Sequence, residues 1–356
     1  MRVAILVGPG GHGDFAPGGH GDFALHPLAR EYLQALLIQS EGVEVVGLVE
    51  GDAVPGSALA SLAALAAEYN VRCIAAPDAL GLKGLDAVVV CGATQQRPAL
   101  IQQAAALTGH ILCPVPFGPT VADAEQCVRG AAEKGVHLHP ALTLRYVPVL
   151  QSLRSMIEQG TLGQLLSLKL QHQARSMAIP GRELLQQNLL HAVDLVRWLC
   201  ATDIVETYAE VGTGLVQADA SVVDVAVLSV VLANGAYATL DTSLSLPGSF
   251  PAPEELQIEV IGTGGWVRVD AYRQRIDTYA AADVTWAEWG SRPVTALVEA
   301  FVNSVRQNPT DSASRAAVHA QAIAQSAVNV PGGHHLPVAV SNATGASSDT
   351  MVNHDH

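Results

Sequence analysis

The sequence predicts an α/β fold in which a Rossmann-type domain with a parallel sheet precedes an α+β domain with a mostly antiparallel sheet. Three observations predict it. Over the first third of the 356 residues, short Val-, Ile- and Leu-rich runs alternate with stretches of helical periodicity. A glycine-rich segment follows the first run. After about residue 200, strands separated by glycine-containing turns replace that alternation.

The expected strands of the first domain are apolar throughout, as strands covered by helices on both faces are. They span residues 3–7, 43–49, 87–91, 110–113 and 135–142, and the helices between them span 27–39, 58–69, 98–107 and 121–134. Proline is expected in the first turn of the third helix, and Thr120 followed by Asp123 resembles a capping box before the fourth. This order is that of a Rossmann-type domain.

The second half is expected to begin with long helices and to continue as hairpins. Gly160 ends the first of these helices, and Asn234-Gly235, a strong hairpin signal, separates two strands. The expected helices span 148–159, 183–200, 295–307 and 314–328, and the strands span 165–173, 224–232, 237–246, 256–261 and 266–270. The last two helices are expected to pack back on the first domain. The predicted domains are 1–140 and 141–337, followed by a polar, disordered tail over 338–356.

Composition excludes several classes of partner and site. A net charge of −14 without any basic run argues against nucleic acid and anionic membranes. No apolar stretch approaches the roughly 20 residues of a membrane span, and the amino terminus lacks a secretory signal, so a soluble, cytoplasmic protein is expected. The five cysteines form no C-x-x-C pair, which favours reduced, mostly buried thiols. No metal site is expected.

A candidate phosphate-binding segment follows the first strand. Gly8, Gly10 and Gly13 match G-x-G-x-x-G, and Glu50 at the end of the second strand is placed to accept both ribose hydroxyls of a dinucleotide. Because no arginine adjoins Glu50, NAD is favoured over NADP. The loop is unusually long, since Pro9–Ala16 is repeated identically as Pro17–Ala24. The alternative is a glycine-rich loop that binds nothing.

Two further segments carry candidate site residues. Ala93, Thr94 and Gln95 follow a buried strand, at the sheet edge where ligands bind in open α/β folds, although an ordinary turn gives the same pattern. Gln187, His191 and Asp194 have i, i+4, i+7 spacing and therefore share one helix face. An imidazole exchanges protons near neutral pH, whereas a glutamine orients a hydroxyl without taking its proton. A lone helical histidine is more often structural.

From the first strand to about residue 337, the chain resembles the glucose-fructose oxidoreductase, inositol dehydrogenase and rhizopine-catabolism family. The resemblance is most specific in segments 85–91, 184–198 and 258–267. It implies that residues 93–95 line the nicotinamide side and that Pro116 matches the proline of a Glu-Lys-Pro segment, with Val115 replacing the lysine. It also implies that His191 and Asp194 are retained while Gln187 replaces an aspartate, that Arg145 and Tyr146 contact substrate, and that the protein is a dimer or tetramer. The alternative for Arg145 is a solvated charge at a strand end, and Asp194 is expected to have a structural role, pairing or capping near the domain junction.

The sequence thus leads to two hypotheses about function. The first is a nicotinamide-dependent oxidoreductase acting on a sugar, polyol or related small molecule, with His191 as the acid/base and Gln187 orienting the substrate. The second is a catalytically inactive relative that binds a dinucleotide or sugar as a sensor or partner subunit. The replacements at Val115 and Gln187 motivate the second hypothesis, because they remove two of the three expected polar groups.

Overall fold

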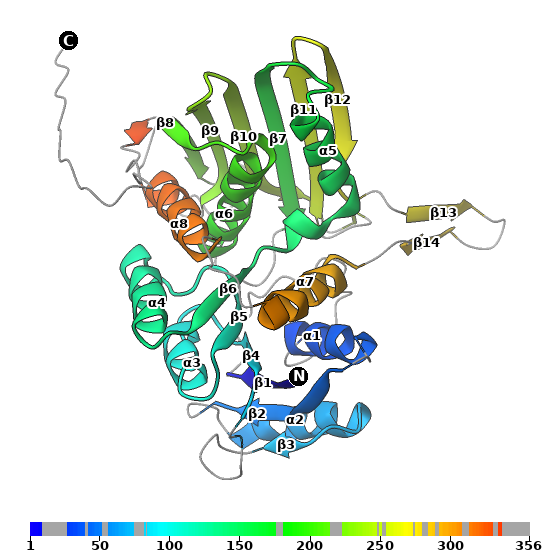
Figure 1. The fold of residues 1–356 in the computed structure, drawn as a ribbon. Coiled ribbons are helices and arrows are strands. Elements are labelled where there is room, and N and C mark those ends of the chain that lie inside the picture. Colours follow the sequence, from blue (N-terminus) through cyan, green and yellow to red (C-terminus); the bar gives the residue numbers. More distant parts are fainter. Residues whose placement is uncertain are drawn as a thin grey trace.

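Two domains, each built around one sheet, make up the structure (Figure 1). The computed structural model describes residues 1–8, 27–39, 42–51, 56–74, 82, 84–175, 181–213, 223–247, 249–250, 254–272, 275–279, 284–288, 292–307, 313–329 and 334–336. The predicted tail lies outside these residues. No helix within these ranges is long and apolar enough to cross a bilayer.

A six-stranded parallel sheet confirms the Rossmann architecture of the first domain. Its order is β3-β2-β1-β4-β5-β6. The strands are β1 (Arg2–Val7), β2 (Glu44–Glu50), β3 (Cys73–Ile74), β4 (Ala87–Cys91), β5 (His110–Pro114) and β6 (His137–Ala141). The sequence did not predict β3, because two residues carry no periodicity. The strand order reverses between β1 and β4, and ligands bind at such a point in open α/β sheets.

Helices cover both faces of this sheet. On one face, α1 (Pro27–Ile38), α2 (Gly56–Glu68) and α7 (Pro293–Gln307) share an apolar cluster with β1 and its neighbours. On the other, α3 (Arg97–Ala104) packs against β4 and β5, and α4 (Val121–Glu133) packs against β6 and α3. The predicted capping box is present at the start of α4, where Thr120 and Asp123 bond each other's backbone N–H groups. Helix α7 lies beside α1, as expected for a helix that packs back on this domain (Figure 1).

The second domain contains a seven-stranded sheet of order β12-β11-β7-β10-β9-β8-β15. Only β7 and β10 run parallel, so the prediction of a mostly antiparallel sheet is confirmed. The strands are β7 (Leu165–Arg175), β8 (Ile204–Thr213), β9 (Val223–Leu232), β10 (Tyr237–Leu246), β11 (Glu254–Gly262), β12 (Gly265–Asp270) and β15 (His334–Leu336). Both predicted hairpins form, and Gly235 has the positive φ of 84° that its turn requires.

Three helices pack on one face of this sheet. They are α5 (Pro148–Glu158), α6 (Gly181–Cys200) and α8 (Ala313–Asn329), and a 3₁₀ helix, Thr143–Tyr146, links β6 to α5. Gly160 ends α5 with a φ of 72°. Helix α8 contacts both α6 and α4 and so joins the two domains. A separate ribbon, β13 (Arg275–Tyr279) with β14 (Val284–Glu288), projects from the body and was not predicted (Figure 1). The five cysteines are unpaired and four are buried, in agreement with reduced thiols.

Candidate active site

The carboxyl ends of three neighbouring strands meet where the order of the first sheet reverses. Val7, the last residue of β1, pairs with Glu50 on β2 and with Cys91 on β4. Gly8 then donates its backbone N–H to the Cys91 carbonyl oxygen at 2.7 Å. The structure therefore brings two predicted cofactor residues, Gly8 and the buried Glu50, to one edge of the sheet.

Three glycines at this edge pack against α3. A Cβ at Gly8, Gly51 or Gly92 would lie 2.7, 2.6 or 2.5 Å from a methyl group of Leu100, so this side chain would have to shift to admit a larger residue. A glycine directly after the first strand and a carboxylate at the end of the second fit a dinucleotide, whose pyrophosphate lies beside such a glycine and whose ribose hydroxyls such a carboxylate accepts. The other two glycines of the predicted motif, Gly10 and Gly13, lie outside the described residues.

The side chain of Arg97 fastens two turns of this edge together. Its guanidinium is fully buried, with Nε donating to the Gly92 carbonyl at 3.1 Å and Nη1 to the Pro116 carbonyl at 2.8 Å. The first turn contains Ala93–Gln95, and the second contains Val115-Pro116, whose peptide bond is cis. The residues predicted for the nicotinamide side therefore lie on two turns that one side chain holds together.

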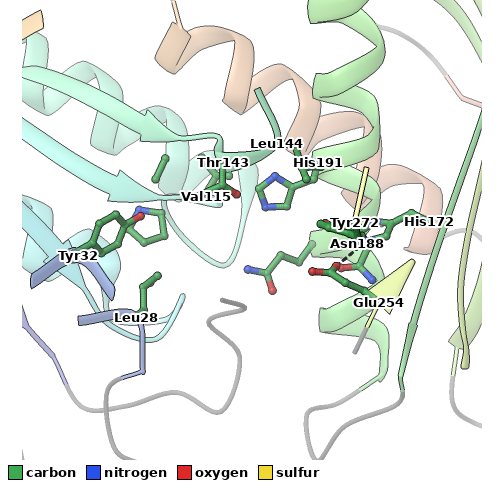
Figure 2. Close-up of a pocket in the computed structure, with 13 residues that line it drawn as sticks. Leu28, Tyr32, Val115, Thr143, Leu144, His172, Asn188, His191, Glu254 and Tyr272 are labelled. Atoms are coloured by element: carbon green, nitrogen blue, oxygen red, sulfur yellow. Dashed lines mark hydrogen bonds and ion pairs between the residues drawn. The ribbon is translucent and has the colours of Figure 1, made fainter. Parts of the chain in front are cut away.

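A pocket that is partly open to solvent lies between the two domains. The wall contributed by the first domain and its linker, hereafter the Rossmann wall, consists of Leu28, Tyr32, Pro114, Val115, Ala141, Thr143 and Leu144. The wall contributed by the second domain, hereafter the polar wall, consists of His172, Gln187, Asn188, His191, Glu254 and Tyr272. Figure 2 shows Leu28 and Tyr32 on one side and the Glu254 group on the other, with His191 between them. The pocket thus brings together three residues singled out from the sequence: Val115, Gln187 and His191.

His191 is partly buried on α6 and faces this pocket. Burial lowers its pKa to about 4, although the carboxylates of Asp194 and Glu254 act in the opposite direction. The nearby His172 and Arg97 lower the pKa further. At neutral pH the imidazole is therefore uncharged and has a lone pair that can accept a proton. This is the protonation state that a general base requires.

A buried polar cluster that the sequence analysis missed lies on the same wall. His172 on β7 and Glu254 on β11 are 3% and 6% exposed, and His172 Nε2 lies 2.8 Å from Glu254 Oε2. Tyr272 is hydrogen-bonded to Glu254, and burial together with that carboxylate raises the pKa of the phenol well above its usual value. Asn188, one position after Gln187, is 4% exposed. One signal was available, because His172 occupies a buried position of an otherwise apolar alternation.

Comparison with known proteins identifies the family to which the chain belongs. Residues 19–142 match the oxidoreductase family with an NAD-binding Rossmann fold, and residues 150–268 match the GFO/IDH/MocA C-terminal domain. Together these segments make up about two thirds of the chain. The protein belongs to the GFO/IDH/MocA oxidoreductase family. The resemblance inferred from the sequence is therefore confirmed.

Relatives within the GFO/IDH/MocA family are distant. An uncharacterized oxidoreductase, YrbE, of Bacillus subtilis (strain 168) is 25% identical over 58% of this chain and 61% of its own length. A myo-inositol 2-dehydrogenase of Thermotoga maritima is 24% identical over 53% of this chain and 58% of its own. The chain thus spans about three fifths of the length of these relatives.

Solved structures share the fold over nearly the whole chain. A putative myo-inositol dehydrogenase from Sinorhizobium meliloti 1021 has a TM-score of 0.74 at 19% identity, covering 95% of this chain and 100% of that one. GenD2 from gentamicin A biosynthesis, solved in complex with NAD, has a TM-score of 0.73 at 20% identity, covering 94% and 96%.

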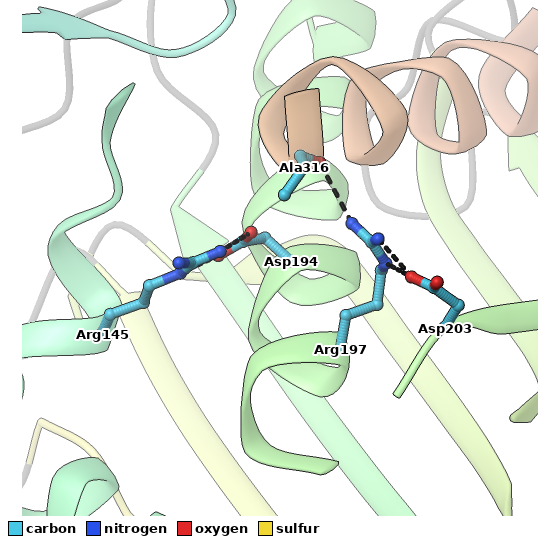
Figure 3. Close-up of polar contacts among 5 residues, drawn as sticks. All are labelled: Arg145, Asp194, Arg197, Asp203 and Ala316. Atoms are coloured by element: carbon cyan, nitrogen blue, oxygen red, sulfur yellow. Dashed lines mark hydrogen bonds and ion pairs between the residues drawn. The ribbon is translucent and has the colours of Figure 1, made fainter. Parts of the chain in front are cut away.

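In this GFO/IDH/MocA chain the two predicted substrate residues do not line the pocket. Arg145 makes a two-pronged ion pair with the buried Asp194, its Nε lying 2.9 Å from Oδ2 and its Nη2 2.5 Å from Oδ1 (Figure 3). Tyr146 packs against the apolar cluster beneath α1 and α7. Arg145 therefore ties the linker after β6 to α6, and a contact with substrate stays a prediction for both residues. On the same helix, Arg197 is paired with Asp203 and donates to the Ala316 carbonyl at 3.2 Å, which ties α6 to α8.

No lysine replaces the missing one within the described residues. Lys134 and Lys169 lie outside the pocket lining, and Lys83 lies outside the described residues. Val115 is 2% exposed and belongs to the apolar core as well as to the pocket. Of the lysine, first aspartate and histidine that the resemblance implies, this sequence has only the histidine, His191, with Val115 and Gln187 at the other two positions.

Proposed function

We propose that the protein is an NAD-dependent oxidoreductase that interconverts an alcohol and a carbonyl group on a sugar, polyol or related small molecule. The observation that carries the proposal is the position of His191, which faces a pocket beside the carboxyl edge of a Rossmann sheet. Relatives named as myo-inositol dehydrogenases and a structural neighbour solved with NAD support this substrate class and cofactor.

The residues of the pocket have different roles in such a reaction. Gly8 and Glu50 would hold the dinucleotide, which would supply the acceptor or donor of the hydride. During oxidation His191, uncharged at neutral pH, takes the proton of the reacting hydroxyl at a ring nitrogen, and it returns this proton during reduction. Gln187, one helical turn earlier on the same face, orients the substrate by hydrogen bonds but takes no proton. Val115 supplies only apolar surface.

Replacing His191 tests the proposal. We expect His191→Ala to lower kcat by about 10²-fold or more, because the acid/base group is lost. NADH binding, followed by fluorescence titration, is expected to stay unchanged, and NADPH is expected to bind more weakly because Glu50 repels a 2′-phosphate. His319→Gln is the control, since this partly buried histidine of α8 does not line the pocket.

Two results would contradict this assignment. Unchanged turnover in His191→Ala would remove the role given to His191. NADH binding without turnover of any sugar or polyol by the native protein would instead favour a sensor or partner subunit.

We also propose that the uncovered face of the second sheet pairs subunits into a dimer or tetramer. This face exposes four large apolar side chains on different strands: Tyr208, Tyr237, Ile261 and Trp266. Exposed apolar groups gathered on one face are typical of protein interfaces. Sedimentation equilibrium checks the proposal, and a monomer at micromolar concentration would contradict it.

A further inference from the structure

The polar wall contains a histidine, His172, whose ring orientation is fixed by a contact with Glu254. A carboxylate only accepts hydrogen bonds, so the 2.8 Å contact with Glu254 Oε2 places a proton on His172 Nε2. In the neutral ring, with this single proton, Nδ1 carries a lone pair. Tyr272 donates to Glu254 as well, which anchors the carboxylate between two side chains. In that neutral form, the chain of contacts presents His172 Nδ1 as a hydrogen-bond acceptor.

Two polar atoms of this wall are buried and meet no partner among the residues that the structure describes. They are Nδ1 of His172 and Nδ2 of Asn188. Their side chains are 3% and 4% exposed, and both line the pocket. Buried polar atoms are almost always hydrogen-bonded in folded proteins, so a ring nitrogen and an amide nitrogen left open at a pocket are groups that a ligand or an ordered water there would bond.

The chemistry of the wall limits what this ligand is. A hydroxyl both donates and accepts, so hydroxyl groups satisfy His172 Nδ1 and Asn188 Nδ2 together. A carboxylate has no proton for Nδ1, and either a carboxylate or a phosphate would place its negative charge close to the Glu254 carboxylate. No lysine or arginine is among the pocket-lining residues that the structure describes. In Figure 2 Asn188, His172, Glu254 and Tyr272 gather on the side of the pocket away from Leu28.

We propose that His172 and Asn188 form a subsite that binds the hydroxyl groups next to the reacting carbon, with Glu254 and Tyr272 as positioning residues. The inference rests on the proposed function and specifies its substrate class as an uncharged polyol with neighbouring hydroxyls. His191 handles the proton of the reacting hydroxyl, while the subsite recognises its neighbours. A substrate that lacks one of them leaves a buried donor or acceptor open and is rejected.

Discrimination between polyols and their deoxy analogues tests the subsite. Steady-state kcat/KM with NAD is measured for myo-inositol and glucose, for their monodeoxy analogues and for glucuronate. We expect the native protein to prefer a full polyol over at least one monodeoxy analogue, and over glucuronate, by about 100-fold. In Asn188→Leu and His172→Phe the preference is expected to fall below about tenfold, chiefly through a higher KM for the full polyol.

Asn188→Leu also separates binding from folding. Because the open donor is removed, the melting temperature is expected to stay the same or to rise. Thr207→Val is the matched control, since Thr207 on β8 is another buried polar side chain outside the pocket lining and its Oγ1 has no partner among the described residues. Wild-type discrimination in both subsite variants, or an equal loss in Thr207→Val, would overturn the subsite.

A spectroscopic measurement keeps this inference separable from the proposed function. In protein labelled with ¹⁵N-histidine, His172 is expected to be the Nε2–H tautomer, and myo-inositol or glucose is expected to shift its Nδ1 resonance. If no substrate is turned over, the proposed function fails, and the Nδ1 shift alone decides whether the subsite binds a polyol. A ring protonated at Nδ1, or a resonance that does not move at saturating polyol, would overturn it.

Discussion

The two walls face the same pocket but differ in the chemistry of their side chains. The Rossmann wall is built from strand ends and helix α1, and five of its seven residues are apolar. The polar wall contains two histidines, two amides, a carboxylate and a phenol. Val115 lies on the first wall, where the family resemblance leads to the expectation of a lysine. Titratable groups that could handle a substrate proton are therefore concentrated on the second domain.

The Rossmann wall mainly supports the structure of the site, whereas the polar wall supplies the groups that can react or form hydrogen bonds. On the Rossmann wall, close packing and one buried guanidinium hold the turns in place. On the polar wall, the side chains differ in what they can donate or accept. Changes to the first wall should therefore alter stability and cofactor affinity, and changes to the second should alter proton transfer.

The largest effect is expected from Arg97→Ala. The substitution leaves the buried carbonyls of Gly92 and Pro116 without this donor and opens a cavity, so we expect the free energy of unfolding to fall by about 3 kcal/mol or more. Urea unfolding measures the loss. Arg129→Ala is the control, because its exposed pair with Glu125 should contribute no more than about 0.5 kcal/mol. Equal losses in the two variants would show that Arg97 does not support the wall.

The fold was largely predictable because its signals are local. Apolar runs, the Thr120 cap and the Asn234-Gly235 turn place most helices and strands within a few residues of their observed bounds. The missed strands are those with weak local signals. β3 has two residues, and the pairing of β8 shifts register between Ile204 and Glu206, which breaks its alternation.

The site was predictable only where its residues are close in sequence. Helical spacing alone put Gln187 and His191 on one face. The contact between His172 and Glu254 joins residues 82 positions apart and depends on the register of β7 with β11. A one-residue slip in that pairing would turn one side chain to the other face, and no local pattern fixes such a register. The same holds for the Arg145–Asp194 pair, whose partners lie on different elements.

Gln187→Asp tests whether proton transfer depends on His191 on the polar wall. A carboxylate one turn before His191 favours the imidazolium, so the pKa of His191 should rise from about 4 by roughly one unit, equivalent to about 1.4 kcal/mol. Because the imidazole must be neutral to act as a base, the acidic limb of the kcat/KM profile for oxidation should move to higher pH by the same amount. Gln187→Asn adds no charge and should leave the limb in place. If the acidic limb of the kcat/KM profile does not move in Gln187→Asp, the protonation of His191 does not determine that limb.

The smallest effect is expected on the Rossmann side, from deleting Pro17–Ala24. Eighteen residues, 9–26, connect Gly8 to the start of α1 at Pro27, and the deletion removes one copy of the repeated octamer. The entropy of ordering a loop grows with the logarithm of its length, so shortening it to ten residues saves about 0.5 kcal/mol. NADH should then bind about twofold more tightly in a fluorescence titration, while kcat stays the same, since the deletion leaves every residue of the polar wall in place.

A double substitution at constant length, His20→Ser with Asp22→Asn, should leave the affinity unchanged, because loop length is the variable under test. Weaker binding after the deletion would instead mean that the second copy itself contacts the dinucleotide, and the Rossmann side would then contribute specific contacts beyond its first glycine.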